Sequence, residues 1–292
     1  MASYKILITG SNGQVGRATL DQLGHDEVFK PIALNHTELD ITRPDHLDAF
    51  IQNNAVAALV NCAAYTAVDK AESDAEPCWA VNASGPRILA QACNRHNIPF
   101  IHLSTDYVYH NNLRRPLKET DDCKPKNVYG ASKLAGEQKS KFHHPKTIIL
   151  RTSWVYAQKG SNFLNTIIDL AKTKSELTIV NDQIGAPTWA TDLAKVIRQI
   201  LSKVLANPNN PEWYGTYNCT NRGAISWFDF ATYFVNYLGL QCHIRPMSSS
   251  EFKRPAPRPA YSVLDLSKIE DTFKPGLRDW NDAVKECLDL MG

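Results

Sequence analysis

The first half of the sequence alternates short β-forming runs with longer segments of helical spacing, which strongly constrains the fold. We predict strands at residues 5–9, 32–34, 57–61, 100–104 and 147–151. A first helix follows the turn at 10–16 and ends near residue 24, and further helices cover 44–53, 75–96 and 127–141. Strands joined through helices form right-handed βαβ crossovers and a parallel sheet covered on both faces. The sequence therefore predicts an α/β, Rossmann-type, doubly wound parallel sheet.

The alternation is looser after residue 155. Helices are predicted over 162–174 and 191–205 and strands at 177–180 and 216–219, whereas the proline-rich run 253–259 suits neither helix nor central strand. We expect an NAD(P)-binding Rossmann domain over 1–155 and mainly a smaller, irregular α/β substrate-binding domain over 156–292. Segments around 177–205 are candidates to rejoin the first domain.

Composition excludes several function classes. The 32 basic and 30 acidic residues nearly balance and form no block, so we expect no nucleic-acid partner. Apolar runs such as 55–60 are far shorter than the roughly 18 residues of a membrane span, and the N-terminus resembles no signal peptide. We therefore expect no membrane partner and a cytoplasmic protein. Seven cysteines without a CxxC pair predict reduced thiols and no zinc site.

A glycine-rich loop stands at the first strand-to-helix junction. It comprises Gly10, Ser11, Asn12, Gly13, Gln14, Val15 and Gly16. Glycines at this spacing permit a tight turn and a close approach of backbone to a diphosphate, which the N–H groups of the following helix attract. A tight turn without a ligand is the alternative, but the position of the loop favours a dinucleotide site.

The end of the second predicted strand bears on which dinucleotide binds. An acidic residue there would hold the adenosine ribose of NAD, but the sequence reads Leu34-Asn35-His36. A 2′-phosphate is therefore not repelled, and Arg17 and His36 are either its partners or ordinary exposed residues. We predict NADPH as cofactor, with NADH also accepted.

Tyr129 and Lys133 lie four residues apart in a predicted helix and therefore share one face. An unperturbed phenol, with a pKa of about 10, transfers protons poorly at neutral pH, and a neighbouring cation lowers that pKa. The hydroxyls of Ser104 and Thr105 end the preceding strand, where parallel sheets bind ligands. This set suits the reduction of a carbonyl group.

The motifs TGSNGQVG (9–16), STDYVY (104–109) and YGASK (129–133) resemble the extended short-chain dehydrogenase/reductase family. The narrower motifs TAVDKAE (66–72), DQIGAPT (182–188) and RPAYSVLD (258–265) resemble a branch of that family that uses NAD(P)H. Its members reduce the C4 ketone of a dTDP-linked 4-keto sugar to dTDP-L-rhamnose. The resemblance spans almost the whole chain and implies a nucleotide-sugar substrate.

The resemblance also implies a role for each matching residue. Tyr129 would donate a proton to the C4 oxygen, Lys133 would hold the nicotinamide ribose and lower the pKa of Tyr129, and Thr105 would bind the same oxygen. The remaining positions would contact the cofactor or the sugar nucleotide. Ser11, Asn12, Gly13, Gln14 and Val15 would line the diphosphate, Asp40 and Ile41 the adenine, Ala63, Ala64, Tyr65 and Thr66 the middle of the cofactor, and Asp106 and Trp154 the substrate.

Several alternatives stay open. Trp154 is either an aromatic plate for a sugar or base, or a residue buried between domains. Tyr107 stands where nucleotide-sugar dehydratases have glutamate, which disfavours elimination. Another nucleotide-sugar 4-reductase or a 4-epimerase would use the same tyrosine and lysine. A regulatory subunit of methionine adenosyltransferase, binding NADP without catalysis, is the non-enzymatic alternative. We assign no metal, and a homodimer stays open.

Overall fold

A six-stranded parallel sheet forms the centre of the computed structural model, which describes residues 3–43, 45, 47–110 and 112–292. The strands lie in the order β10-β5-β4-β3-β1-β2. Their bounds are β1 Tyr4–Thr9, β2 Phe29–Leu34, β3 Val56–Asn61, β4 Phe100–Thr105, β5 Thr147–Thr152 and β10 Gly215–Asn218. This arrangement confirms the predicted α/β fold with a doubly wound parallel sheet.

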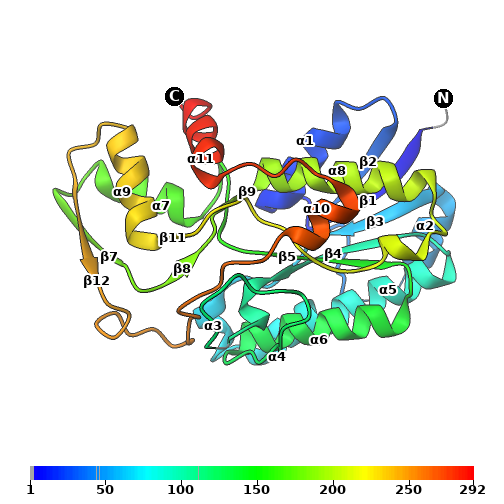
Figure 1. Ribbon diagram of the computed structural model, residues 1–292. Helices are drawn as coiled ribbons and strands as arrows, with labels where there is room; N and C mark the ends of the chain where they lie inside the picture. The colour runs from blue at the N-terminus through cyan, green and yellow to red at the C-terminus, as the bar shows by residue number, and fades with distance from the viewer. Residues whose placement is uncertain (1–2, 44, 46, 111) are drawn as a thin grey trace.

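Helices cover both faces of this sheet (Figure 1). One face carries α1 (Gln14–Gly24), α8 (Ala190–Ala206) and α10 (Ser267–Phe273), which share an apolar core with the sheet. The other carries α2 (Leu47–Asn54), α3 (Val68–Ala71), α4 (Ala75–Trp79), the π-helix η1 (Ala80–Ser84), α5 (Gly85–Arg95) and α6 (Val128–His143). A short 3₁₀ turn, η2 (Asp106–Val108), follows β4. Both faces of the strands are thus buried, as their continuous apolar sequences require.

The remaining elements pack around a second apolar core, seen at the left of Figure 1. They are β6 (Val155–Tyr156), α7 (Phe163–Ala171), β7 (Glu176–Val180), β8 (Ile184–Gly185), β9 (Thr188–Trp189), β11 (Ile225–Ser226), α9 (Trp227–Tyr237), β12 (His243–Met247) and α11 (Trp280–Asp289). Strands pair here in three short ladders, β7 with β12, β8 with β11 and β6 with β9. Between β9 and β11 the chain returns to the large sheet and forms α8, the 3₁₀ turn η3 (Pro211–Trp213) and β10.

Three elements differ from the predicted spans. The single helix expected over 75–96 contains the π-helical turn η1, which ends two residues before Pro86, whose ring nitrogen has no N–H for an ordinary helical bond. Strand β2 begins at Phe29 rather than residue 32, and it tolerates Pro31 because it lies at the sheet edge. The helix expected over 44–53 is described from Leu47, and residues 44 and 46 lie outside the described residues.

No helix in the described ranges is both long enough and apolar enough to span a membrane.

Candidate active site

The glycine-rich loop joins β1 to α1 and forms a cradle that larger residues would fill. Gly10 has φ +66°, and a Cβ there would lie 2.5 Å from the backbone nitrogen of Ala63. A Cβ at Gly16 would collide with the carbonyl oxygen of Gly10. Within the described residues, no side chain caps the N-terminus of α1 at Gly13, so its N–H groups are available to an anion. The loop therefore fits a dinucleotide diphosphate.

The other predicted cofactor residues lie in loops that follow the neighbouring strands. The Asp40 carboxylate accepts hydrogen bonds from the backbone (2.9 Å) and hydroxyl (2.7 Å) of Thr42, which hold its pKa below the ordinary value. Ile41 is buried against Gly85. After β3, the backbone N–H of Tyr65 donates to Oδ1 of Asn82 at 2.9 Å. The carboxyl ends of parallel strands meet at one edge of a sheet. The loops after β2 and β3 therefore lie at the same edge as the glycine-rich loop after β1, and they contain Asp40, Ile41, Ala63, Ala64, Tyr65 and Thr66.

The side chains proposed to bind a 2′-phosphate are both open to solvent. Arg17 is exposed on α1, and His36 is exposed in the turn that follows β2. That turn is ordered by Asn35, whose Oδ1 accepts from the backbone N–H and the hydroxyl of Thr37 at 2.9 and 2.7 Å. The candidate partners of a 2′-phosphate therefore stay predictions.

The first turn of α6 carries Tyr129 and is fixed by polar contacts. Oδ1 of Asn127 caps the helix by accepting from the N–H of Gly130 at 2.7 Å. The carboxylate of Glu72, the residue directly after α3, accepts from the N–H of Val128 at 2.8 Å. A Cβ at Gly130 would lie 2.5 Å from the carbonyl oxygen of Tyr107, so only glycine lets α6 approach η2 this closely. Tyr129 thus has a rigid backbone, as a catalytic side chain requires.

Of the three predicted catalytic side chains, Thr105 and Tyr129 are neighbours, and Lys133 lies one helical turn beyond Tyr129 on α6. Thr105 ends β4, and burial raises the pKa of the Tyr129 phenol while the neighbouring Thr105 hydroxyl opposes that shift. Burial outweighs the predicted lowering by Lys133, so the phenol stays protonated at neutral pH. Lys133 donates to the carbonyl oxygen of Leu103 at 2.6 Å, and burial lowers the pKa of its amine to about 8.

Asp106 is a buried carboxyl group next to Thr105 and is only 1% exposed. Its Oδ1 accepts from the Thr105 hydroxyl at 3.0 Å. Its Oδ2 has no well-aligned hydrogen-bond partner among the residues that the structure describes. Burial raises the pKa of Asp106 to about 6. The Ser262 hydroxyl opposes that shift, but no bond to Oδ2 is well aligned, so this oxygen can accept from a ligand hydroxyl.

The Trp154 indole packs against two segments distant in the sequence, which bears on the two interpretations of this residue. Trp227 stacks on the indole with ring centroids 3.4 Å apart and planes 8° from parallel. Gly185 lies against it as well, since a Cβ there would be 2.6–2.8 Å from three indole atoms. Trp154 also has φ +48°, a conformation rare for bulky residues and common at functional sites. Trp227 therefore covers one face of the indole, and the Trp154 side chain stays half-buried.

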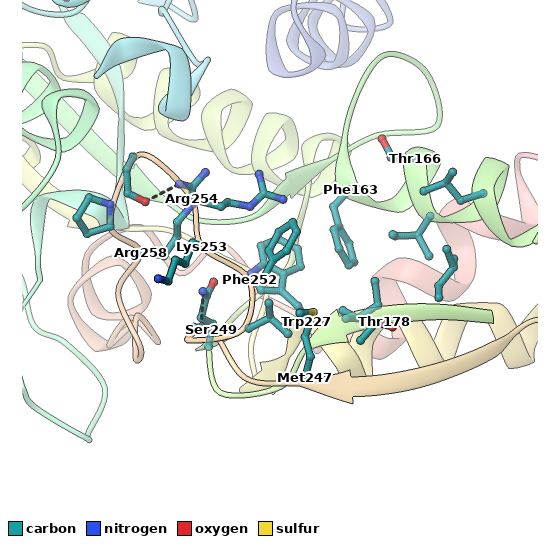
Figure 2. A pocket seen from close by; sticks show the side chains of 18 of the residues that line it. Phe163, Thr166, Thr178, Trp227, Met247, Ser249, Phe252, Lys253, Arg254 and Arg258 are labelled. Carbon is teal, nitrogen blue, oxygen red and sulfur yellow. Dashed lines mark hydrogen bonds between the residues drawn. The ribbon is translucent and has the colours of Figure 1, made fainter. Parts of the chain in front are cut away.

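A pocket of about 870 Å³ begins at Tyr107, whose ring packs edge-on against Tyr129 with centroids 5.6 Å apart. Its lining is divided by chemistry (Figure 2). Lys253, Arg254 and Arg258 lie at one end, whereas Phe163, Leu170, Leu177, Ile179, Trp227 and Met247 form the apolar part. The volume suits a ligand larger than a simple sugar, with an anionic part and a flat or apolar part.

Asp69 ties the pocket wall to the sheet domain, a contact that the sequence did not reveal. Its carboxylate forms ion pairs with Arg258 and Arg254 and accepts from the backbone N–H of Ala256. The bond from Arg258 is the main cause that lowers the pKa of Asp69 to about 2. The 248–259 loop, orange in Figure 1, is thereby anchored to α3. The sequence gives no local signal for this contact, because the partners of Asp69 lie more than 180 residues away.

We expect Asp69→Asn to loosen the 248–259 loop and expose it to trypsin. Within this loop only the Lys253–Arg254 bond is cleavable, because proline follows both Arg254 and Arg258. Charged hydrogen bonds contribute about 1.5–3 kcal/mol, so cleavage after Lys253 should accelerate roughly tenfold or more, as measured by mass spectrometry. Asp122→Asn, which breaks the exposed pair with Lys124, is the control. Equal cleavage rates in the Asp69 variant and the wild type would show that Asp69 does not anchor the loop.

A second contact missed by the sequence is a buried ion pair beneath the site. Arg151 donates to Glu137 at 2.6 and 2.9 Å, and both side chains are almost fully buried. Ser104 donates to the same carboxylate at 2.5 Å, and Arg151 donates to the Tyr109 hydroxyl at 2.6 Å. The network fixes β4, β5 and α6, the elements that carry or flank Thr105 and Tyr129.

Comparisons with known proteins agree with this geometry. The profile of the family described as "RmlD substrate binding domain" matches residues 4–292. A dTDP-4-dehydrorhamnose reductase of Aggregatibacter actinomycetemcomitans is 38% identical, over 96% of this chain and 97% of the relative. The crystal structure of a dTDP-4-dehydrorhamnose reductase from Clostridium acetobutylicum has a TM-score of 0.91 at 40% identity, covering 98% of this chain and 99% of the other. One from Bacillus anthracis, in complex with NADP, has a TM-score of 0.90 at 33% identity and covers 99% of both chains.

Proposed function

This chain belongs to the RmlD substrate-binding domain family, and from that membership we propose that it reduces the C4 ketone of dTDP-4-dehydro-L-rhamnose to give dTDP-L-rhamnose. The observation that carries the proposal is the placement of Tyr129. It lies near Thr105, at the sheet edge that bears the glycine-rich loop, and beside a pocket with one basic end. A hydride carrier and a nucleotide sugar can therefore meet at one hydroxyl group.

The chain's own residues supply the proton and the positioning. The glycine-rich loop and Lys133 would hold NADPH, which when bound would supply the hydride for C4. Tyr129 Oη donates its proton to the C4 oxygen, which becomes the product hydroxyl, and the phenolate recovers a proton from water after the product leaves. Thr105 holds the same oxygen in place. The raised pKa of Tyr129 suits this direction, because the residue must begin the reaction as a phenol.

The pocket supports a nucleotide-sugar substrate. Lys253, Arg254 and Arg258 line one end, where cations suit a diphosphate. The aromatic rings of Phe163 and Trp227 line the apolar part and suit a pyrimidine base. We infer that the buried Asp106 carboxyl group, next to Thr105, and Trp154 bind the sugar. The seven cysteines are free thiols, which supports a reducing cytoplasmic location.

The experiment that tests this function incubates the purified protein with dTDP-4-dehydro-L-rhamnose and NADPH or NADH and follows loss of reduced-nicotinamide absorbance. We expect turnover with the sugar nucleotide present and none without it, with NADPH preferred. If the protein binds NADPH but consumes none, the regulatory alternative is supported and the reductase proposal is wrong. Turnover only with a different nucleotide 4-keto sugar would keep the chemistry and reassign the substrate.

A further inference from the structure

Thr9, Asn61 and His102 have no part in the proposed reaction, but together they form a buried chain of polar side chains that ends at Lys133. The Thr9 hydroxyl donates to Oδ1 of Asn61 at 2.6 Å. Nδ2 of Asn61 lies 2.9 Å from Nδ1 of His102, and Nε2 of His102 lies 3.5 Å from Nζ of Lys133. Thr9, Asn61 and His102 have no exposed surface, and Lys133 is almost fully buried. Solvent therefore does not satisfy these groups.

The contacts around Asn61 determine which nitrogen of His102 carries a proton. The backbone N–H of Ala63 can only donate, and it lies 3.1 Å from Oδ1 of Asn61. This fixes the orientation of the amide, so the Asn61 NH₂ group donates to His102. Nδ1 of His102 must then accept, and a neutral imidazole carries its proton on Nε2. Burial holds the pKa of His102 well below its ordinary value, so the ring is neutral.

The N–H of His102 is thus directed at the amine of Lys133. A donor N–H facing an ammonium group is repelled, whereas the lone pair of a neutral amine can accept from it. We propose that Asn61 and His102 form a positioning pair that fixes Lys133 and favours its neutral amine. Thr9 and the Ala63 backbone orient Asn61, and Asn61 in turn selects the histidine tautomer.

The other titratable groups near Lys133 do not supply this effect. Glu137 on the same helix favours the ammonium form, but its carboxylate is paired with Arg151. Cys62 after β3 and Cys78 on α4 are neutral thiols, since burial raises the pKa of both and that of Cys62 to about 12. Burial of Lys133 acts in the same direction as His102 and lowers the amine pKa to about 8.

The consequence for turnover rests on the proposed function. When Tyr129 gives up its proton, a nearby amine close to its titration point can take up a proton at small cost and balance the new negative charge. A permanently charged Lys133 would instead stabilise the phenolate before the reaction begins and would hold the pKa of Tyr129 lower throughout the cycle. His102 would therefore adjust the acid strength of the site without touching the substrate.

Two replacements of His102 separate the N–H from the bulk of the ring. His102→Leu keeps a similar volume but removes the N–H. His102→Gln places an amide N–H close to the position of Nε2. The free protein is labelled with ¹³C at lysine Cε, and the Lys133 resonance is identified by its absence in Lys133→Arg. We expect Lys133 to titrate at least about one pH unit higher in His102→Leu, a tenfold change in acid dissociation, and near the wild-type value in His102→Gln.

Equal titration in His102→Leu and the wild type, or equal shifts in the two variants, would overturn the proposal. Ile101→Val, a neighbouring change on β4 within the core, is the control for packing. If His102→Leu does not fold, ¹⁵N spectra of the wild-type imidazole still decide. The proposal requires a proton on Nε2 and none on Nδ1 at neutral pH, and the opposite tautomer or an imidazolium contradicts it. Because these measurements use the free protein, their failure is separate from failure of the reductase assay.

Discussion

Replacing Tyr129 with phenylalanine should lower kcat by about a hundredfold to ten-thousandfold, the contribution of a positioned general acid. The phenyl ring preserves the edge-on packing against Tyr107, so the backbone of α6 and the glycine-rich loop should stay intact. Only the proton for the C4 oxygen is removed. Steady-state kinetics with the 4-keto sugar nucleotide measure the loss, and a fluorescence titration with NADPH should give nearly wild-type affinity.

Tyr156→Phe is the matched control for this replacement. Tyr156 is also a buried tyrosine, but it belongs to the second apolar core, and its hydroxyl has no hydrogen-bond partner among the described residues. Its removal should leave kcat close to the wild-type value. If the Tyr129 variant kept near-normal turnover, or lost activity only because it no longer bound NADPH, Tyr129 would not be the proton donor.

The largest effect on stability is expected for Glu137→Ala. The variant leaves the Arg151 guanidinium, only 4% exposed, without its carboxylate. Removing one partner of a buried ion pair costs about 3–5 kcal/mol, which corresponds to a fall in Tm of roughly 5–8 °C for a chain of this size. Urea denaturation followed by circular dichroism measures the free energy of unfolding directly.

Two further variants test whether the unpaired charge of Arg151 causes the loss of stability in Glu137→Ala. Asp48→Ala breaks the exposed pair with Arg95 and should cost no more than about 1 kcal/mol. The double variant Glu137→Met, Arg151→Met removes both charges and should recover much of the stability lost by Glu137→Ala. A cost below about 1 kcal/mol for Glu137→Ala itself would contradict the role assigned to this pair.

The parallel sheet and the meeting of Thr105 with Tyr129 could be predicted because their signals are local. Strand and helix spacing define the βα alternation, and parallel strands must place their carboxyl ends at one edge. The Asp69–Arg258 contact joins residues 189 positions apart, and no local pattern pairs them. The same holds for Trp154, which packs against Gly185 and Trp227 from distant segments.

The electrostatic character of the site was the least predictable part. A cation four residues from Tyr129 suggested a lowered phenol pKa, but burial raises it, and burial cannot be read from helix spacing. The contacts of His102 in β4 are likewise not visible in the sequence. The importance of His102 for Lys133 depends on the orientation of Asn61, which is visible only when the Ala63 backbone is placed beside it. Charge states within a site thus require the three-dimensional contacts.

The central claim is that the chain delivers a hydride to C4 of a dTDP-linked sugar, and isotope transfer tests it most directly. The wild-type protein is supplied with dTDP-4-dehydro-L-rhamnose and NADPH carrying deuterium at both C4 positions of the nicotinamide, and the product is read by NMR. We predict one deuterium at C4 of the sugar and dTDP-L-rhamnose as the product. Deuterium at another carbon, or unchanged sugar with all deuterium retained in the cofactor, would contradict the account.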